Sequence, residues 1–250
     1  RAYSSGTPAI GVGAGNVTVI VDETADLAAA ARKIAASKCF DNATSCSSEN
    51  AVVVVEAAYE GFARALRAEG AALLPAEMES HVVERLWPGG KLNRHALASD
   101  ADVLIEALEL GDLAGPETRF IVQPTEGIGA DHPLSGEKLS LVLALYRAPD
   151  FEAAKALAAR LLAHQGAGHS VGIHTSDDGR AMALGHDLPS CRVIVNQAHC
   201  FATGGAFNNA LPFSLSMGCG SWGGNSIDEN LHWKHFLNIT KVVREIPEQV

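Results

Sequence analysis

The stretch that decides the fold is Ala-Val-Val-Val-Val-Glu at residues 51–56. Its apolar residues follow one another without the polar alternation of a half-buried strand, which indicates a strand covered on both faces. A second strand is predicted at residues 17–21, Val-Thr-Val-Ile-Val, because all five residues are β-branched. Strands covered on both faces occur mainly in parallel sheets that carry helices on either side, so these two runs favour an α/β fold.

Helical segments alternate with further short strands along the chain. Between the two runs, an alanine-rich segment predicts a helix that ends near Lys38, with Thr24 and Asp26 as candidate N-caps. The other expected elements are helices at 57–67, 76–86, 101–110 and 151–162 and from about 179, and strands at 120–122, 139–146, 171–175 and 192–196. This alternation predicts one α/β domain with a largely parallel sheet flanked by helices. The glycine-rich sequence after residue 195 predicts a tightly turning loop.

The composition argues against several classes of function. The 250 residues include 19 Lys and Arg against 29 Asp and Glu, and no basic stripe offers itself to nucleic acid. No apolar run approaches the roughly 20 residues of a membrane helix, and the run at residues 51–55 is only long enough for a strand. Five cysteines without a Cys-x-x-Cys pair argue against a disulfide framework and indicate a reducing compartment. We therefore expect a cytoplasmic protein with neither a nucleic-acid nor a membrane partner.

Cys46 is the strongest candidate for a nucleophile. It lies in Phe-Asp-Asn-Ala-Thr-Ser-Cys-Ser-Ser-Glu at residues 40–49, between a predicted helix and the buried strand. Small polar neighbours leave the sulfur accessible and predict a pKa lowered from the value of about 8.5 of a free thiol. Backbone N–H groups and the amide of Asn42 could stabilise an oxyanion formed beside the sulfur. The alternative is an inert structural cysteine.

Two further residues become candidates by their place before a strand. His169 follows the Gly-Ala-Gly of residues 166–168 at a strand edge, where functional side chains are often presented, although a lone histidine is more often structural. Glu137 opens a predicted strand and, taken alone, reads as a surface residue.

Two other patterns lack the neighbouring elements or the spacing that a dinucleotide site or a zinc site requires. The Gly-Val-Gly-Ala-Gly-Asn of residues 11–16 is followed rather than preceded by a strand, and Asn16 replaces the third glycine, so it predicts a turn and no dinucleotide site. The last third of the chain holds possible metal ligands at His199, Cys200, His232 and His235. Their spacing fits no closed tetrahedral zinc site, and we predict no bound metal.

Residues 40–49 and 218–226 resemble motifs of the CoA-acylating aldehyde dehydrogenases, a family that includes one half of the bifunctional aldehyde–alcohol dehydrogenases. Further matching segments follow in the same order at residues 2–16, 137–140, 168–170 and 234–238. The resemblance implies an aldehyde dehydrogenase-like catalytic domain over residues 1–250. It also implies that the N-terminal nucleotide-binding domain is absent and that about the last 25 residues form an oligomerisation tail of a homo-oligomer.

The resemblance also implies a mechanism. Cys46 would attack a small aldehyde to give a thiohemiacetal, hydride would pass to NAD or NADP, and the resulting thioester would be transferred to coenzyme A. Glu137 would hydrogen-bond the nicotinamide ribose, Leu139 would contact the nicotinamide ring, and His169 would activate a thiol or orient coenzyme A.

One position bears on the acyl acceptor. Val12 lies 34 residues before Cys46, where the hydrolytic aldehyde dehydrogenases carry a glutamate base. Because valine cannot activate water, the comparison favours coenzyme A. The alternatives are a hydrolytic, non-acylating dehydrogenase and an inactive oligomerisation domain.

The substrate is less well defined. Polar residues are expected to line its pocket, together with one phenylalanine: Thr44, Ser45, Ser47, Phe201, Thr203 and Asn208. Residues 201–205 resemble members that act on sulfoacetaldehyde, while acetaldehyde, propionaldehyde and succinate semialdehyde stay open.

Overall fold

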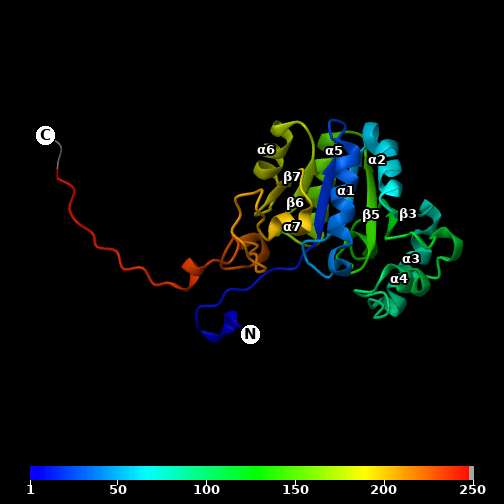
Figure 1. Ribbon diagram of the computed structural model, residues 1–250. Coiled ribbons are helices and arrows are strands. Elements are labelled where there is room, and N and C mark those ends of the chain that lie inside the picture. The colour runs from blue at the N-terminus through cyan, green and yellow to red at the C-terminus, as the bar shows by residue number, and fades with distance from the viewer. Residues whose placement is uncertain (248–250) are drawn as a thin grey trace.

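The computed structural model describes residues 1–247, which form one seven-stranded parallel sheet between layers of helices (Figure 1). The strands are β1 Val17–Val21, β2 Glu49–Val55, β3 Ala71–Leu73, β4 Phe120–Pro124, β5 Val142–Ala148, β6 Val171–His174 and β7 Val193–Val195. The helices are α1 Leu27–Lys38, α2 Glu56–Ala68, α3 Glu79–Leu86, α4 Ala101–Ala107, α5 Phe151–His164, α6 Asp178–Asp187 and α7 His199–Thr203. The predicted α/β class with a parallel sheet is confirmed.

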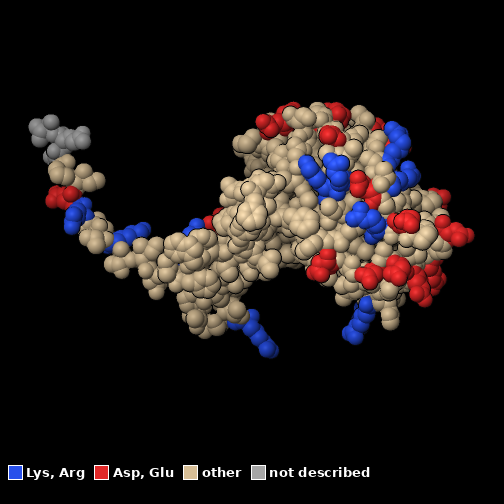
Figure 2. Space-filling view, in the orientation of Figure 1, with Lys and Arg blue, Asp and Glu red and all other residues tan. Residues whose placement is uncertain are grey.

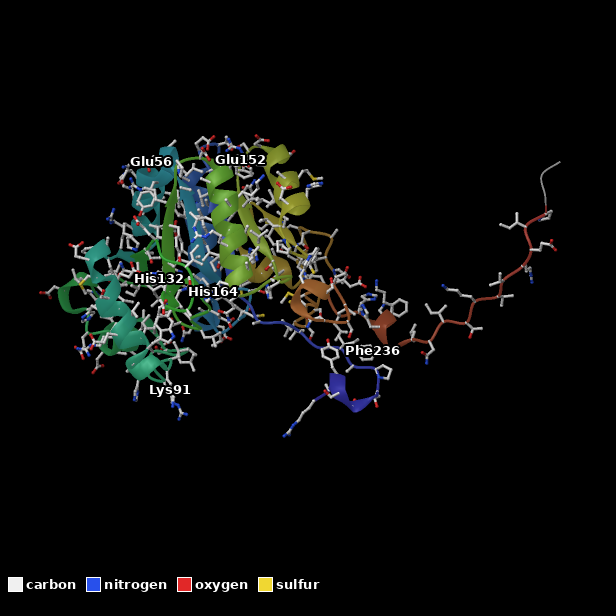
Figure 3. All side chains as sticks on the ribbon, turned by 180° about the vertical axis from the view of Figure 1, so that it is seen from behind. Glu56, Lys91, His132, Glu152, His164 and Phe236 are labelled. Carbon is white, nitrogen blue, oxygen red and sulfur yellow. The ribbon has the colours of Figure 1, made fainter. Side chains whose placement is uncertain are left out.

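The strand order β3-β4-β5-β2-β1-β6-β7 explains where the helices lie. The chain moves along the sheet in one direction from β1 to β2 and in the opposite direction from β5 to β6. Because such crossovers are right-handed, α1 and α5 must cover opposite faces. Figures 1 and 3 show α1, α2 and α7 on one face and α5 on the other. The central strand β2 is therefore buried along its whole length, as the apolar run predicted.

The differences from the sequence prediction have local causes. The strand β3 was missed because Ala-Ala-Leu is short and carries no β-branched residue. The strand β5 begins three residues later than predicted, since Leu139 adopts a left-handed φ of 44° that no strand can contain. Asp26 is the N-cap of α1 and accepts from the Ala29 N–H at 2.9 Å, whereas the Thr24 hydroxyl donates to Asp22. The short helix α7 lies where only a loop was expected.

The N-terminal segment and the C-terminal glycine-rich region form an uncharged part of the surface. Residues 2–21 and 199–226 contain no Lys, Arg, Asp or Glu. Figure 2 shows charged side chains of both signs spread over the helical part of the molecule, with few on the lobe beside it. No helix among the described residues is long and apolar enough to cross a membrane.

The predicted oligomerisation tail has two parts in the structure. Residues up to 236 end in a short 3-10 turn, Trp233–Phe236, and residues 237–247 run away from the body without regular structure (Figure 1). The extended part exposes apolar side chains at Ile239, Val242, Val243 and Ile246. Residues 248–250 of the predicted tail lie outside the described residues.

Candidate active site

The candidate residues lie at the amino edge of the sheet. Cys46 precedes β2, Glu137 and Leu139 precede β5, and His169 precedes β6. Because β5, β2, β1 and β6 are neighbours and parallel, the loops before them meet at one edge. In Figure 3, Glu56 and Glu152 mark the carboxyl edge, and His164 at the end of α5 marks the amino edge. Open α/β sheets usually bind ligands at the carboxyl edge, so this site occupies the opposite one.

The loop that carries Cys46 has an unusual backbone. Asp41, Asn42 and Ala43 have φ values of 48°, 48° and 59°, so three consecutive non-glycine residues are left-handed. Each such residue costs roughly 1–2 kcal/mol, and conformations of this kind cluster at functional sites. The turn ends at Cys46, whose side chain is half-buried.

The structure brings Cys46 and His169 together. Nε2 of His169 lies 3.4 Å from Sγ of Cys46, although 123 residues separate the two in sequence. Burial, with a smaller contribution from Arg192, lowers the pKa of His169 to about 4, so the imidazole is neutral at neutral pH. The site therefore contains a neutral imidazole within reach of the sulfur.

The predicted lowering of the Cys46 pKa is wrong. Burial raises the pKa of this thiol, and the charge of Glu137 raises it further. The hydrogen bonds from the side chain of Ser47 and from the backbone N–H of Cys46 lower it, but they do not outweigh burial. The sequence showed the polar neighbours and could not show how much water the fold removes.

Glu137 and Leu139 lie on the loop before β5, and the charge of Glu137 acts on Cys46. The Glu137 backbone N–H donates to Oε1 of Gln165 at 3.0 Å, and burial raises the pKa of its carboxyl group. Among residues 1–247 no hydrogen bond or ion pair occupies this carboxylate, which leaves it free to accept a hydroxyl. Leu139 is half-buried, and its carbonyl accepts from the Ala98 N–H at 2.9 Å.

The structure does not bring the Asn42 amide to Cys46. Its Nδ2 donates to Oδ1 of Asp100 at 2.7 Å and to the Ala98 carbonyl at 3.3 Å. Both donors of the amide are thus used to tie the strained turn to the segment before α4. In this geometry Asn42 fixes the loop and does not face an oxyanion at the sulfur.

The glycine run at residues 11–16 packs directly against the Cys46 loop. A Cβ at Gly15 would collide with the Cys46 carbonyl oxygen and lie 2.9 Å from the Cys46 Cβ. A Cβ at Gly13 would lie 3.1 Å from Sγ of Cys219. These glycines allow close approach of two backbones. The strand β1 follows them as predicted, but residues 11–16 run without a turn.

We expect Gly15→Ala to destabilise the fold by about 1–3 kcal/mol, because the added methyl group must displace the nucleophile loop. Urea unfolding measures this free energy. Gly115→Ala is the matched control, since a Cβ at Gly115 meets nothing within 4 Å. Equal unfolding free energies for the two variants would contradict the close packing.

Two site residues were missed by the sequence analysis. Oγ of Ser170 lies 2.7 Å from Nδ1 of His169 and 2.8 Å from Nε2 of His199, so a buried chain leads from Cys46 to α7. The only signal in the sequence was a serine directly after His169. His199 had been considered only as a possible metal ligand in a predicted loop.

A cavity of about 430 Å³ adjoins the Cys46 loop. Its lining is mostly apolar and consists of Phe40, Cys200, Phe201, Gly204, Gly205, Phe213, Ser214 and Leu215. Of the residues predicted to line the substrate pocket, Phe201 lines this cavity, and Asn208 lines a second cavity to which Phe201 also contributes. Thr203 is fully buried and its hydroxyl donates to the His199 carbonyl. Thr44, Ser45 and Ser47, which were also predicted to line the pocket, are not among the residues that line this cavity.

A metal centre is not formed by the described residues, which contain no group of three or more His, Cys, Asp or Glu arranged to hold an ion.

Comparisons with known proteins give a consistent result. No family model matches the chain. An acylating sulfoacetaldehyde dehydrogenase of Cupriavidus necator is 51% identical, and the match covers 100% of this chain and 50% of that protein. A bifunctional aldehyde-alcohol dehydrogenase of Escherichia coli is 38% identical over 97% of this chain and 28% of its own length.

The fold comparison agrees with the sequence comparison. The crystal structure of an acetylating aldehyde dehydrogenase from Geobacillus thermoglucosidasius superposes with a TM-score of 0.90 at 36% identity, over 99% of this chain and 55% of that one. The chain spans about half the length of the sulfoacetaldehyde dehydrogenases that it matches.

Proposed function

The chain belongs to the acylating aldehyde dehydrogenase family, and from this premise we propose that it is the catalytic domain of an enzyme that oxidises a small aldehyde to an acyl-CoA. The observation that carries the proposal is the distance of 3.4 Å between Sγ of Cys46 and Nε2 of His169. The loop that carries Cys46 is held in a strained turn. The nucleotide-binding domain would belong to the other half of the relatives' length. An assay of the full-length protein with and without coenzyme A tests the proposal.

Cys46 would form the covalent intermediate. Its sulfur attacks the aldehyde carbon, and the carbonyl oxygen becomes the oxyanion of a thiohemiacetal. The Cys46 backbone N–H makes no hydrogen bond to another residue among those described, so it can donate to that oxyanion. The imidazole of His169, kept neutral by its lowered pKa, lies within hydrogen-bond reach of the sulfur.

Glu137 and Leu139 fit the site of a nicotinamide. A nicotinamide held there by Glu137 and Leu139 would supply the hydride acceptor of the oxidation. The Glu137 carboxylate has a free acceptor edge beside Cys46, which suits the hydroxyls of a ribose. Its own charge raises the pKa of Cys46, so a ligand that donates to this carboxylate would relieve part of the increase.

We expect Glu137→Gln to weaken cofactor use about tenfold, the effect of one charged hydrogen bond. The KM for NAD or NADP and the rate of hydride transfer measure this loss. Alkylation of Cys46 should be as fast or faster, because the charge that raises its pKa is removed. Glu126→Gln, an exposed glutamate just beyond β4 at the carboxyl edge, is the control. Slower alkylation with unchanged cofactor use would contradict this assignment.

Sulfoacetaldehyde is the substrate that we propose first. The support is the 51% identity with an acylating sulfoacetaldehyde dehydrogenase over the whole chain. Acetaldehyde, propionaldehyde and succinate semialdehyde are the competitors, and the mostly apolar cavity at Phe40 and Cys200 suits the first two. A ranking of kcat/KM over the four aldehydes decides among them.

We also propose a cytoplasmic homo-oligomer. The support for the oligomer is the exposed segment 237–247, whose side chains Ile239, Val242, Val243 and Ile246 a second copy of the chain could cover. The support for the cytoplasm is the set of five free cysteines.

A further inference from the structure

We propose that His199 is a positioning residue that acts through Ser170 to hold the imidazole of His169 with its proton on Nε2, facing Cys46. The inference rests on the proposed role of Cys46 as nucleophile and deepens it. It assigns His169 as a hydrogen-bond donor to the sulfur in the resting enzyme.

The chain of contacts is continuous, and its part from His169 through Ser170 to His199 is closed to water. Nε2 of His169 is 3.4 Å from the sulfur, its Nδ1 is 2.7 Å from Oγ of Ser170, and that oxygen is 2.8 Å from Nε2 of His199. The two histidines are 2% and 1% exposed, and Ser170 is fully buried. No solvent molecule can therefore replace a missing donor along this part of the chain.

The single hydroxyl proton of Ser170 couples the two rings. Both imidazoles are neutral, since burial and the neighbouring Arg192 lower the pKa of each, and His169 and His174 add to the effect at His199. The hydroxyl can donate to only one ring and must then accept from the other. Either His199 donates and His169 carries its proton on Nε2, or His169 donates through Nδ1 and presents a bare Nε2 to the sulfur.

The far nitrogen of His199 decides between the two arrangements. Nδ1 of His199 is buried and has no hydrogen-bond partner. It faces Gly172 of β6, where an added Cβ would lie 2.9 Å away, so a Cα hydrogen of this glycine points at the nitrogen. A bare lone pair suits a C–H neighbour, whereas an N–H there would be a buried donor without an acceptor. His199 therefore carries its proton on Nε2 and donates to Ser170.

The consequence falls on Cys46. The charge of Glu137 opposes ionisation of the sulfur, and the buried guanidinium of Arg192, which bonds to the His169 and Gly218 carbonyls, has a small favourable interaction with the thiolate. An N–H donor on His169 adds a hydrogen bond that strengthens when the sulfur is a thiolate. Removing the donor from His199 frees the Ser170 hydroxyl to turn, and this support for the thiolate is lost.

The test is the pH profile of Cys46 alkylation by iodoacetamide, followed by peptide mass spectrometry, in the full-length protein. We expect His199→Phe, which keeps a ring but has no donor, to move the profile upward by about one pH unit, which is tenfold slower alkylation at neutral pH. His199→Gln places an N–H near the position of Nε2 and should restore most of the rate.

Two further variants keep the test decisive. Ser170→Ala should reproduce the effect of His199→Phe, and the double variant should add nothing, because both break one chain. His174→Phe, a buried histidine at the end of β6 outside the chain, is the control and should leave the profile unchanged. Equal profiles for the Phe and Gln variants at position 199 would overturn the proposal. Alkylation needs no aldehyde, cofactor or coenzyme A, so this result is independent of the assay of the proposed function.

Discussion

Replacing Cys46 by serine is expected to reduce aldehyde oxidation by the full-length protein on the order of 10⁴-fold or more. A serine hydroxyl is a weak nucleophile unless a base activates it. The pKa of about 4 leaves His169 a poor base, so it cannot supply that activation. The variant should fold normally, because the change removes no packing volume of consequence at a half-buried position. The formation of NADH or NADPH with aldehyde and coenzyme A measures the loss.

Cys200→Ser is the matched control for this prediction. Cys200 lines the cavity beside the same loop and, like Cys46, is a half-buried thiol whose pKa is raised by burial. The raised pKa therefore does not distinguish the two thiols, and the contact with His169 does. Limited alkylation should label Cys46 before the other four cysteines. Retained activity in Cys46→Ser together with loss in Cys200→Ser would transfer the nucleophile to Cys200.

The fold was predictable because short local patterns of residues are enough to identify its central strands. The uninterrupted valines of β2 and the β-branched residues of β1 are enough to predict that both strands are buried, as they are in the structure. The elements that were missed, β3 and α7, have three and five residues. The strand β3 depends on its pairing with β4, and the helix α7 depends on its packing against α1. Neither contact can be predicted from a local sequence pattern.

For the candidate active site, the sequence predicted individual residues but not the contacts between them. Cys46, Glu137 and His169 each stand before a strand, and the sheet order then brings them to one edge. The chain from Cys46 to His199 depends on the neighbouring positions of β2, β1 and β6, which no short motif contains. The same limit explains the wrong sign of the Cys46 pKa, because burial is a property of the assembled fold.

Without coenzyme A, the full-length protein is expected to release one equivalent of NADH or NADPH per active site and then stop. Steady turnover should begin only when coenzyme A is added. Water attack on the Cys46 thioester lacks a general base, whose help is typically worth on the order of 10²–10⁴-fold. A thiolate needs less help, since it is intrinsically a strong nucleophile. Rapid mixing, followed by the absorbance of the reduced nicotinamide, measures the burst. Its amplitude should equal the concentration of active sites.

Val12 is the position that makes this prediction specific. Its segment lies against the nucleophile, as the close approach of Gly15 to Cys46 shows, and the valine side chain is 57% exposed. Val12→Glu should give slow hydrolytic turnover without coenzyme A if the new carboxylate reaches the thioester. Val12→Gln, of similar size, offers no base and should give no turnover without coenzyme A. Sustained turnover of the unaltered protein without coenzyme A, with a free acid as product, would replace the acylating assignment by the hydrolytic one.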